Sequence, residues 1–130
     1  MRYTEDGNPV SDSLLVQLRK GVLDMCVLAM LARKDGYAYD IASRLAEDIG
    51  MGEGTIYPLM RRMQSDGLVK TYLEESSSGP PRKYYQLTKA GRAALITQKA
   101  EWNAFTASVA KILADVNLAT PVAKIVGAGS

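Results

Sequence analysis

The sequence predicts a mainly α-helical chain with a small β-hairpin, arranged as a winged helix-turn-helix and followed by a long C-terminal helix. Three observations support this fold class. Residues 54–67 have the spacing of an amphipathic helix that ends at Gly67. Residues 68–87 alternate as two strands around a polar loop, and residues 89–117 hold a heptad-like apolar pattern. A helix, a strand, a loop and a second strand in so short a stretch form the outline of a winged helix-turn-helix.

Composition is that of one domain with an appendage. The chain has 130 residues, of which 47% are hydrophobic and 23% charged. The chain has sixteen basic and fourteen acidic residues, and the resulting net charge of +2 does not by itself indicate a nucleic-acid partner. Between Glu53 and Arg92, however, basic residues outnumber acidic ones by seven to four. The positive charge is therefore concentrated in the predicted winged unit.

Several classes of function are excluded by residues that the chain lacks. It has no histidine and one cysteine, so triad-type catalysis and the usual zinc sites have no ligands or bases to use. We therefore expect no enzyme activity, no catalytic residues, no cofactor and no metal. Cys26 lies in an apolar run and is expected to be a small buried hydrophobe, with a redox-sensing thiol as the alternative.

No stretch of the sequence has the length of a membrane span. The longest uninterrupted apolar run, Met25 to Ala32, is far short of the ~20 residues that a bilayer requires. The first residues are polar and lack the hydrophobic segment of a signal peptide. A cytoplasmic protein with no membrane partner is expected.

Residues 11–88 are predicted to form the winged domain, after a flexible tail at residues 1–10. Any of the polar residues 11–13 can cap a first helix that runs to about Arg33 and stops at Asp35-Gly36. Gly21 inside this helix indicates a close backbone contact or a break. Apolar residues at intervals of four predict a second helix from Tyr37 to Ile49, and a glycine-rich turn follows at residues 50–54.

The third helix is predicted to start near Gly54 or Thr55, with Pro58 in its first turn, where a missing N–H costs nothing. Its inward stripe has the i, i+3, i+4, i+7 spacing of a buried helix face and consists of Ile56, Leu59, Met60 and Met63. Gly67 is placed to be a left-handed C-cap. Two strands follow, Val69 to Leu73 and Tyr84 to Leu87, and the polar loop from Glu74 to Pro81 is expected to be the wing.

Residues 89–117 are predicted to be a dimerisation helix that Thr88 caps, and residues 118–130 a flexible tail. The apolar seam of this helix is spaced in threes and fours and comprises Leu95, Gln98, Trp102, Phe105, Val109, Ile112 and Val116. A domain that is already closed cannot bury such a seam, and exposed apolar patches mark interfaces. A second copy is the expected partner, with contacts from Trp102, Phe105, Val109, Ile112 and Leu18.

The outward side of the third helix holds groups that a DNA major groove accepts. Arginine can pair bidentately with guanine, and hydroxyls can donate to phosphates or bases. The predicted DNA contacts are Thr55, Tyr57, Arg61 and Arg62 on the helix and Arg82 and Lys83 on the wing. Taken alone, Arg61 and Arg62 are more often solvated surface charges. The cationic pair on the neighbouring hairpin favours double-stranded DNA as the partner.

The residues that support this hypothesis also resemble a known family, the PadR family of bacterial transcriptional regulators. The matching segments are Lys20–Leu23, Val27–Leu31, Tyr37–Ile41, Gly54–Met63, Asp66–Val69 and Arg82–Gly91. The chain is similar to the small-tailed subgroup with a single C-terminal dimerisation helix. It departs from the family pattern at Ala38, where glycine is usual.

The resemblance implies a homodimeric repressor on a palindromic operator, released in some members by a small aromatic ligand between the subunits. Trp102 matches the position of an aromatic residue that stacks on such ligands, whereas an aromatic on a heptad seam more often only packs against the partner helix. The alternative function is a protein–protein interaction module that keeps the winged fold without specific DNA binding.

Overall fold

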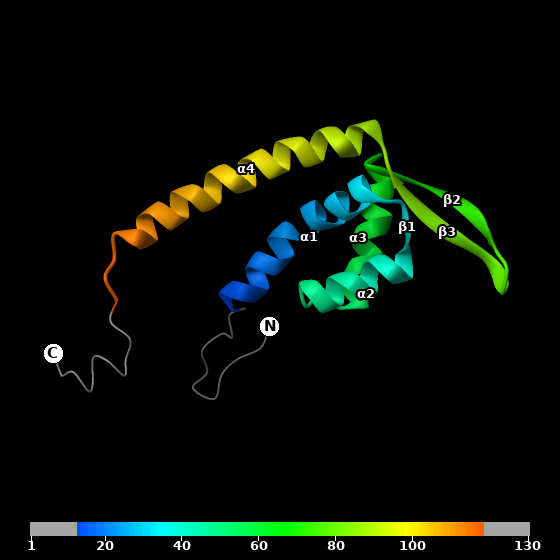
Figure 1. Cartoon of the computed structure of the whole chain (residues 1–130), viewed down its shortest axis with the longest axis horizontal. Helices are drawn as coiled ribbons and strands as arrows, with labels where there is room; N and C mark the ends of the chain where they lie inside the picture. The colour runs from blue at the N-terminus through cyan, green and yellow to red at the C-terminus, as the bar shows by residue number, and fades with distance from the viewer. Residues whose placement is uncertain (1–12, 119–130) are drawn as a thin grey trace, which may run out of the picture. The chain divides into compact units, whose positions relative to one another are not determined.

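The structure is a computed structural model, and it describes residues 13–118 (Figure 1). Its elements are α1 (Leu14–Arg33), β1 (Gly36–Tyr37), α2 (Ala38–Asp48), α3 (Glu53–Ser65), β2 (Val69–Ser76), β3 (Gly79–Leu87) and α4 (Lys89–Ala114). The chain divides into two compact units, residues 1–97 and residues 98–130, and each is described by itself. The predicted tail at residues 1–10 lies outside the described residues, as does the tail at residues 118–130 except for Leu118.

The predicted fold class is confirmed, because helices dominate and the strands form a small antiparallel sheet. The first helix has the predicted bounds and is capped by Ser13, whose hydroxyl accepts a hydrogen bond from the Val16 N–H at 3.2 Å. Gly21 marks neither a break nor a close contact with another described segment, since α1 is continuous and no atom of residues 13–118 beyond its own stretch of helix lies within 4 Å of the position that a Cβ would take.

A short strand that was not predicted precedes the second helix. Gly36 and Tyr37 form β1 and pair with Tyr85 and Tyr84 of β3, so the sheet order is β1-β3-β2. The second helix therefore starts at Ala38 and ends at Asp48, inside the predicted range of Tyr37 to Ile49. Two residues are too few to show the alternation that identifies a strand, and only their pairing partner reveals them.

The third helix starts slightly earlier than predicted, at Glu53, after Gly52 as its N-cap. The prediction that Pro58 lies in the first turn was therefore wrong, because the proline stands one turn inside the helix and removes a backbone hydrogen bond there. All four residues of the predicted inward stripe are buried. Gly67 has φ of 77° and forms the predicted cap, with the Leu68 N–H bonded to the Met63 carbonyl at 3.0 Å.

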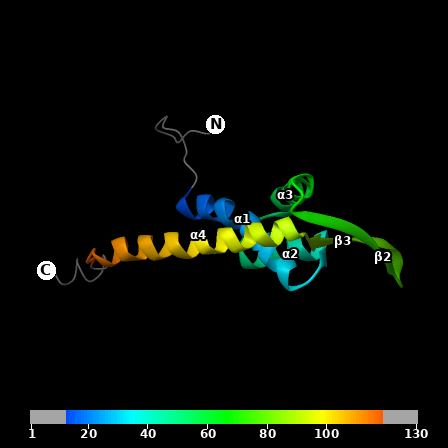
Figure 2. The same cartoon turned by 90° about the horizontal axis from the view of Figure 1, so that it is seen from above.

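The hairpin differs most from its prediction. The strands continue through the residues 74–81 that were expected to be a loop, and the hairpin closes at Ser77 and Ser78 (Figures 1 and 2). Ser76 pairs with Gly79, and an irregularity in the register lies between Glu74 and Ser76. The prolines at 80 and 81 are tolerated because they lie at this irregularity, where neither has a regular partner on β2, and because β1 pairs only with Tyr84 and Tyr85.

One hydrophobic core lies in the unit formed by residues 1–97, between the helices and one face of the sheet. It contains Leu23, Val27, Leu28, Leu31, Ile41, Ala42, Leu45, Met51, Ile56, Leu59, Met60, Met63, Val69 and Tyr85. Cys26 is half-buried against this core, and burial raises the pKa of its thiol, as suits a packing residue. Within residues 13–118 no helix is both long and apolar enough to cross a membrane.

The fourth helix is capped as predicted, since the Gly91 N–H donates to the Thr88 hydroxyl at 3.0 Å. It ends at Ala114 rather than at Asn117. Asp115 and Val116 donate tighter turn-type bonds to the carbonyls of Ile112 and Leu113 instead. Val116, the last residue of the predicted seam, therefore lies beyond the regular helix.

Candidate nucleic-acid interface

The exposed side of α3 is the centre of the candidate interface. Thr55 and Arg61 are both exposed, on the sides of the helix that the buried stripe leaves free. Within residues 13–118 the Arg61 guanidinium makes no ion pair or side-chain hydrogen bond. All its N–H groups are therefore available to an external acceptor, which is what contact with a base edge or a phosphate requires.

Tyr57 is less accessible than its neighbours on this helix. Its ring is half-buried and packs against the core. Burial raises the pKa of its hydroxyl, and the nearby charge of Glu53 raises it further. The phenol is therefore protonated at neutral pH and can donate a hydrogen bond, although much of the ring acts as packing.

Arg62 is engaged by a helix that the sequence did not connect with it. Its Nη2 atom donates to both carboxylate oxygens of Asp24 on α1, each at 3.0 Å. The side chains of the pair remain 54% and 37% exposed, respectively, so solvent screens the attraction between them. Arg61 and Arg62 are adjacent in sequence, but the structure places them in different electrostatic environments.

Arg82 and Lys83 point to opposite faces of the hairpin. Strand alternation puts Lys83 on the face of Tyr85, and its Nζ atom lies 5.7 Å from the centre of that ring. This face packs against the helices, because Tyr85 and Val69 are buried in the core. Arg82 lies on the other face, with its guanidinium carbon 4.8 Å from the ring centre of Tyr37.

A row of tyrosines crosses all three strands on the face of Arg82. Tyr84 of β3 lies between Tyr37 of β1 and Tyr72 of β2, with ring centres 5.6 and 5.7 Å away. The Tyr72 hydroxyl donates to Asp35 at 2.8 Å, and this bond raises the pKa of Tyr72 to about 12. This row could not be predicted from the sequence, because it depends on the strand formed by Gly36 and Tyr37.

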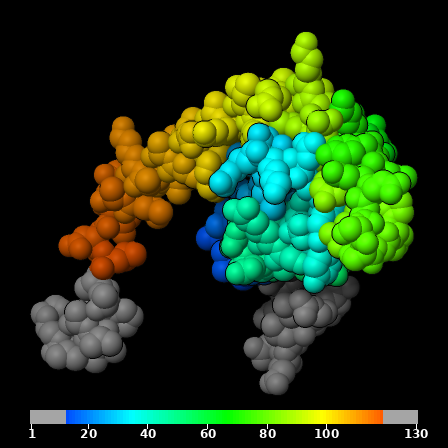
Figure 3. All heavy atoms as spheres, turned by 45° about the vertical axis from the view of Figure 1, so that its right-hand side comes forward, coloured from blue at the N-terminus to red at the C-terminus, as the bar shows by residue number. Residues whose placement is uncertain are grey.

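The end of α3 is tied to the start of α4, and this junction positions the hairpin. The Thr88 hydroxyl donates to the Gly67 carbonyl at 2.7 Å, and the Thr88 N–H donates to the Leu68 carbonyl at 3.1 Å. Gly91 is buried against Leu68. The strands leave from this junction and extend past the helices, and Figure 3 shows the hairpin beside β1 and α2.

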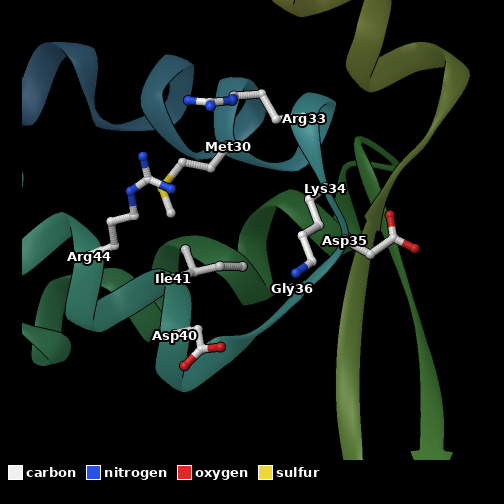
Figure 4. Close-up of a pocket in the computed structure, with 8 residues that line it drawn as sticks. All are labelled: Met30, Arg33, Lys34, Asp35, Gly36, Asp40, Ile41 and Arg44. Atoms are coloured by element: carbon white, nitrogen blue, oxygen red, sulfur yellow. The ribbon is translucent and has the colours of Figure 1, made fainter.

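A cavity of about 530 Å³ lies between the end of α1, β1 and α2, and none of the predicted contact residues lines it. Figure 4 shows Met30 and Ile41 within it, with charged residues around them. Asp35 already accepts the Tyr72 hydroxyl, and Arg44 is paired with Asp48 at 3.5 Å. Among residues 13–118 no group of histidine, cysteine or acidic side chains could hold a metal ion.

The predicted interface residues are largely accessible within their own units. On α1, the predicted interface residue Leu18 is 42% exposed. Its neighbours Leu14 and Leu15 are 70% and 55% exposed. In the second unit, Trp102 is 37% exposed and Phe105 61%. Ile112 is exposed as well, whereas Val109 is half-buried.

Comparison with known proteins identifies the family. Residues 27–97 match the model of the transcriptional regulator PadR-like family. The chain belongs to this family. An uncharacterized protein of Lysinibacillus sphaericus is 30% identical over 87 residues, which are 64% of this chain and 80% of the relative.

Solved structures of PadR regulators have the same fold. A PadR-like transcriptional regulator from Bacillus cereus is 36% identical, with a TM-score of 0.70 over 75% of this chain and 96% of the other. A family member from Eggerthella lenta is 38% identical, with a TM-score of 0.66 over 77% and 88% of the two chains. This PadR-like chain is therefore a DNA-binding transcriptional regulator and not an enzyme.

Proposed function

We propose that this PadR-like chain is a homodimeric repressor whose α3 enters the major groove of a palindromic operator. The observation that carries the proposal is the exposed Arg61 on the outward side of α3, which has no ion-pair partner among the described residues and lies beside a hairpin that bears Arg82 and Lys83. Cationic groups on two neighbouring elements can neutralise phosphates while one helix contacts base edges. Thr55 and the hydroxyl of Tyr57 add donors at the start of the same helix.

The exposed apolar residues of both units support pairing with a second copy. Leu18 and its neighbours on α1 are exposed apolar side chains, as are Trp102, Phe105 and Ile112 on α4, and exposed apolar patches mark interfaces. A two-fold pair of recognition helices would contact half-sites about one turn of DNA apart, ~34 Å. Repression follows if the bound dimer occludes a promoter.

The same proposal includes a small aromatic effector that stacks on Trp102 at the dimer interface and releases the DNA. The indole is 37% exposed in its unit, and a flat ligand stacking on it at a dimer interface would contact both copies. Such a ligand releases DNA only if it binds one spacing of the recognition helices more tightly than the other. A Trp102 that only packs against the partner helix is the competing role.

The test is the affinity of Arg61→Ala for an operator duplex selected by the wild-type protein from a random pool. We expect the substitution to weaken binding by ~1–3 kcal/mol, because a bidentate contact with a base is lost. Fluorescence anisotropy with labelled duplex measures the affinity. The midpoint of thermal unfolding should not change, since Arg61 makes no ion pair or side-chain hydrogen bond within residues 13–118.

Arg44→Ala is the matched control, because it removes the same charge from α2, where the arginine is paired with Asp48. Equal losses for the two variants would mean that Arg61 contributes only general charge. A protein that selects no duplex, or whose affinity does not fall steeply with added salt, would instead be a protein-interaction module.

A further inference from the structure

A groove lies between α1 and α3. It brings Arg62, a predicted DNA contact on α3, next to Asp24 on α1, a helix to which we have assigned no role in DNA binding. Lys20, Asp24, Thr55 and Arg62 line a cavity of about 360 Å³ together with Leu23, Pro58 and Leu59. Asp24 is the only acidic residue among them. Its carboxylate accepts hydrogen bonds from Arg62. Thr55, a second predicted DNA contact, lines the same cavity.

We propose that Asp24 is a positioning residue for DNA recognition, which holds the Arg62 guanidinium in the orientation that contacts the operator. The inference rests on the proposed function, because it assumes that α3 enters the groove of DNA. Both bonds to Asp24 come from the single atom Nη2, at 3.0 Å. The N–H groups of Nε and Nη1 are not used by Asp24 and remain for a base or a phosphate.

Orientation matters here because an arginine side chain has many rotamers. Holding one of them in the free protein removes part of the entropy that binding would otherwise cost. The carboxylate also has an opposing effect, since it repels the phosphates of DNA. Positioning and repulsion predict different results when Asp24 is neutralised, so they can be separated.

The experiment compares Asp24→Asn with Asp48→Asn in the full chain. Asp48 is a matched control, because it is also an exposed partner of an arginine, on α2, and its neutralisation changes the net charge equally. Affinity is measured for the selected operator and for a scrambled duplex of the same length. We expect Asp24→Asn to lower the preference for the operator about three- to fivefold relative to Asp48→Asn, the upper range for an exposed ion pair.

A second pair of variants tests whether the effect passes through Arg62. In an Arg62→Ala background, Asp24→Asn should change the operator preference no further, because the group that it positions is absent. Arg62→Lys should lose preference as Asp24→Asn does, since it keeps the charge but not the planar fork.

Three outcomes would overturn the inference. Equal preferences for Asp24→Asn and Asp48→Asn would show that Asp24 does not act through orientation. Tighter operator binding by Asp24→Asn than by Asp48→Asn would make Asp24 a competitor for Arg62. An effect that persists without Arg62 would make its role structural. Failure of the wild-type protein to prefer any duplex would instead refute the proposed function itself.

Discussion

At Gly91 the absence of a side chain allows α4 to start against the hairpin. A Cβ at this position would overlap the Leu68 carbonyl oxygen, which is a backbone atom, and would also press on the end of the Leu87 side chain. The residue is buried at the junction where Thr88 binds the backbone of Gly67. This glycine is therefore required by packing and not by its backbone conformation.

Gly91→Ala should destabilise the protein by about 1–3 kcal/mol or more, because the added methyl overpacks the junction. Gly21→Ala is the matched control, since Gly21 lies in the interior of α1 with open space around its Cα. That control should gain about 0.5–1 kcal/mol from reduced backbone entropy. Urea unfolding measures both, and equal effects would contradict the packing at Gly91.

The candidate contact residues show how far sequence reasoning reaches at the residue scale. The inward stripe of α3 was predictable, because helical spacing alone places four residues on one face. The different environments of Arg61 and Arg62 were not predictable. Asp24 lies 38 positions earlier in the chain, and only the packing of α1 against α3 brings it to Arg62.

At the scale of elements, the hairpin determines which cation can assist α3. Its strands extend through residues 74–81, and their alternation sends Lys83 to the face that packs on the helices and Arg82 to the opposite face. A single DNA duplex that contacts α3 cannot be contacted equally by both side chains. Their adjacency in the sequence had predicted one cationic pair that acts together.

Lys83→Ala should therefore weaken operator binding more than Arg82→Ala does. A lost phosphate contact should reduce the slope of log affinity against log salt by about 1, and we expect this change for Lys83. Arg82, stacked over Tyr37, should affect the stability of the sheet instead. Anisotropy titrations at several salt concentrations give both slopes, and equal slopes would rule out the facial assignment.

The hairpin was mispredicted for a physical reason. Serine, glycine and proline between two strands usually indicate a loop. Here the prolines lie where the register with β2 is irregular and where β1 does not reach, so their missing N–H groups remove no regular strand pair. The composition of residues 74–81 predicted that the strands would end there. In the structure, the pairing between β2 and β3 continues to Ser76 and Gly79.

At the scale of the whole molecule, the proposed repressor needs a second copy. Phe105 is 61% exposed on the seam of α4, so Phe105→Glu should place a charge in the dimer interface and give monomers. Asn103→Glu is the control, because Asn103 lies on the opposite side of the same helix. Sedimentation velocity distinguishes the two forms, and a dimer that survives Phe105→Glu would move the interface elsewhere.

Loss of the dimer should also lower operator affinity, since two half-sites would then be bound independently. The hairpin and α3 lie in the other unit, so their fold should be unchanged in the monomer, as circular dichroism can check. Unchanged operator affinity in a confirmed monomer would show that one copy is sufficient for binding.

Local sequence patterns were enough to predict the family, the order of the helices, the buried stripe of α3 and the cap at Gly67. These features depend on local spacing and on backbone geometry, which a few neighbouring residues specify. Packing in three dimensions sets the strand at Gly36 and Tyr37, the length of the hairpin, the tyrosine row and the hydrogen bonds from Arg62 to Asp24. Each of these joins segments far apart in the chain, and no local pattern records which distant residue will supply the partner.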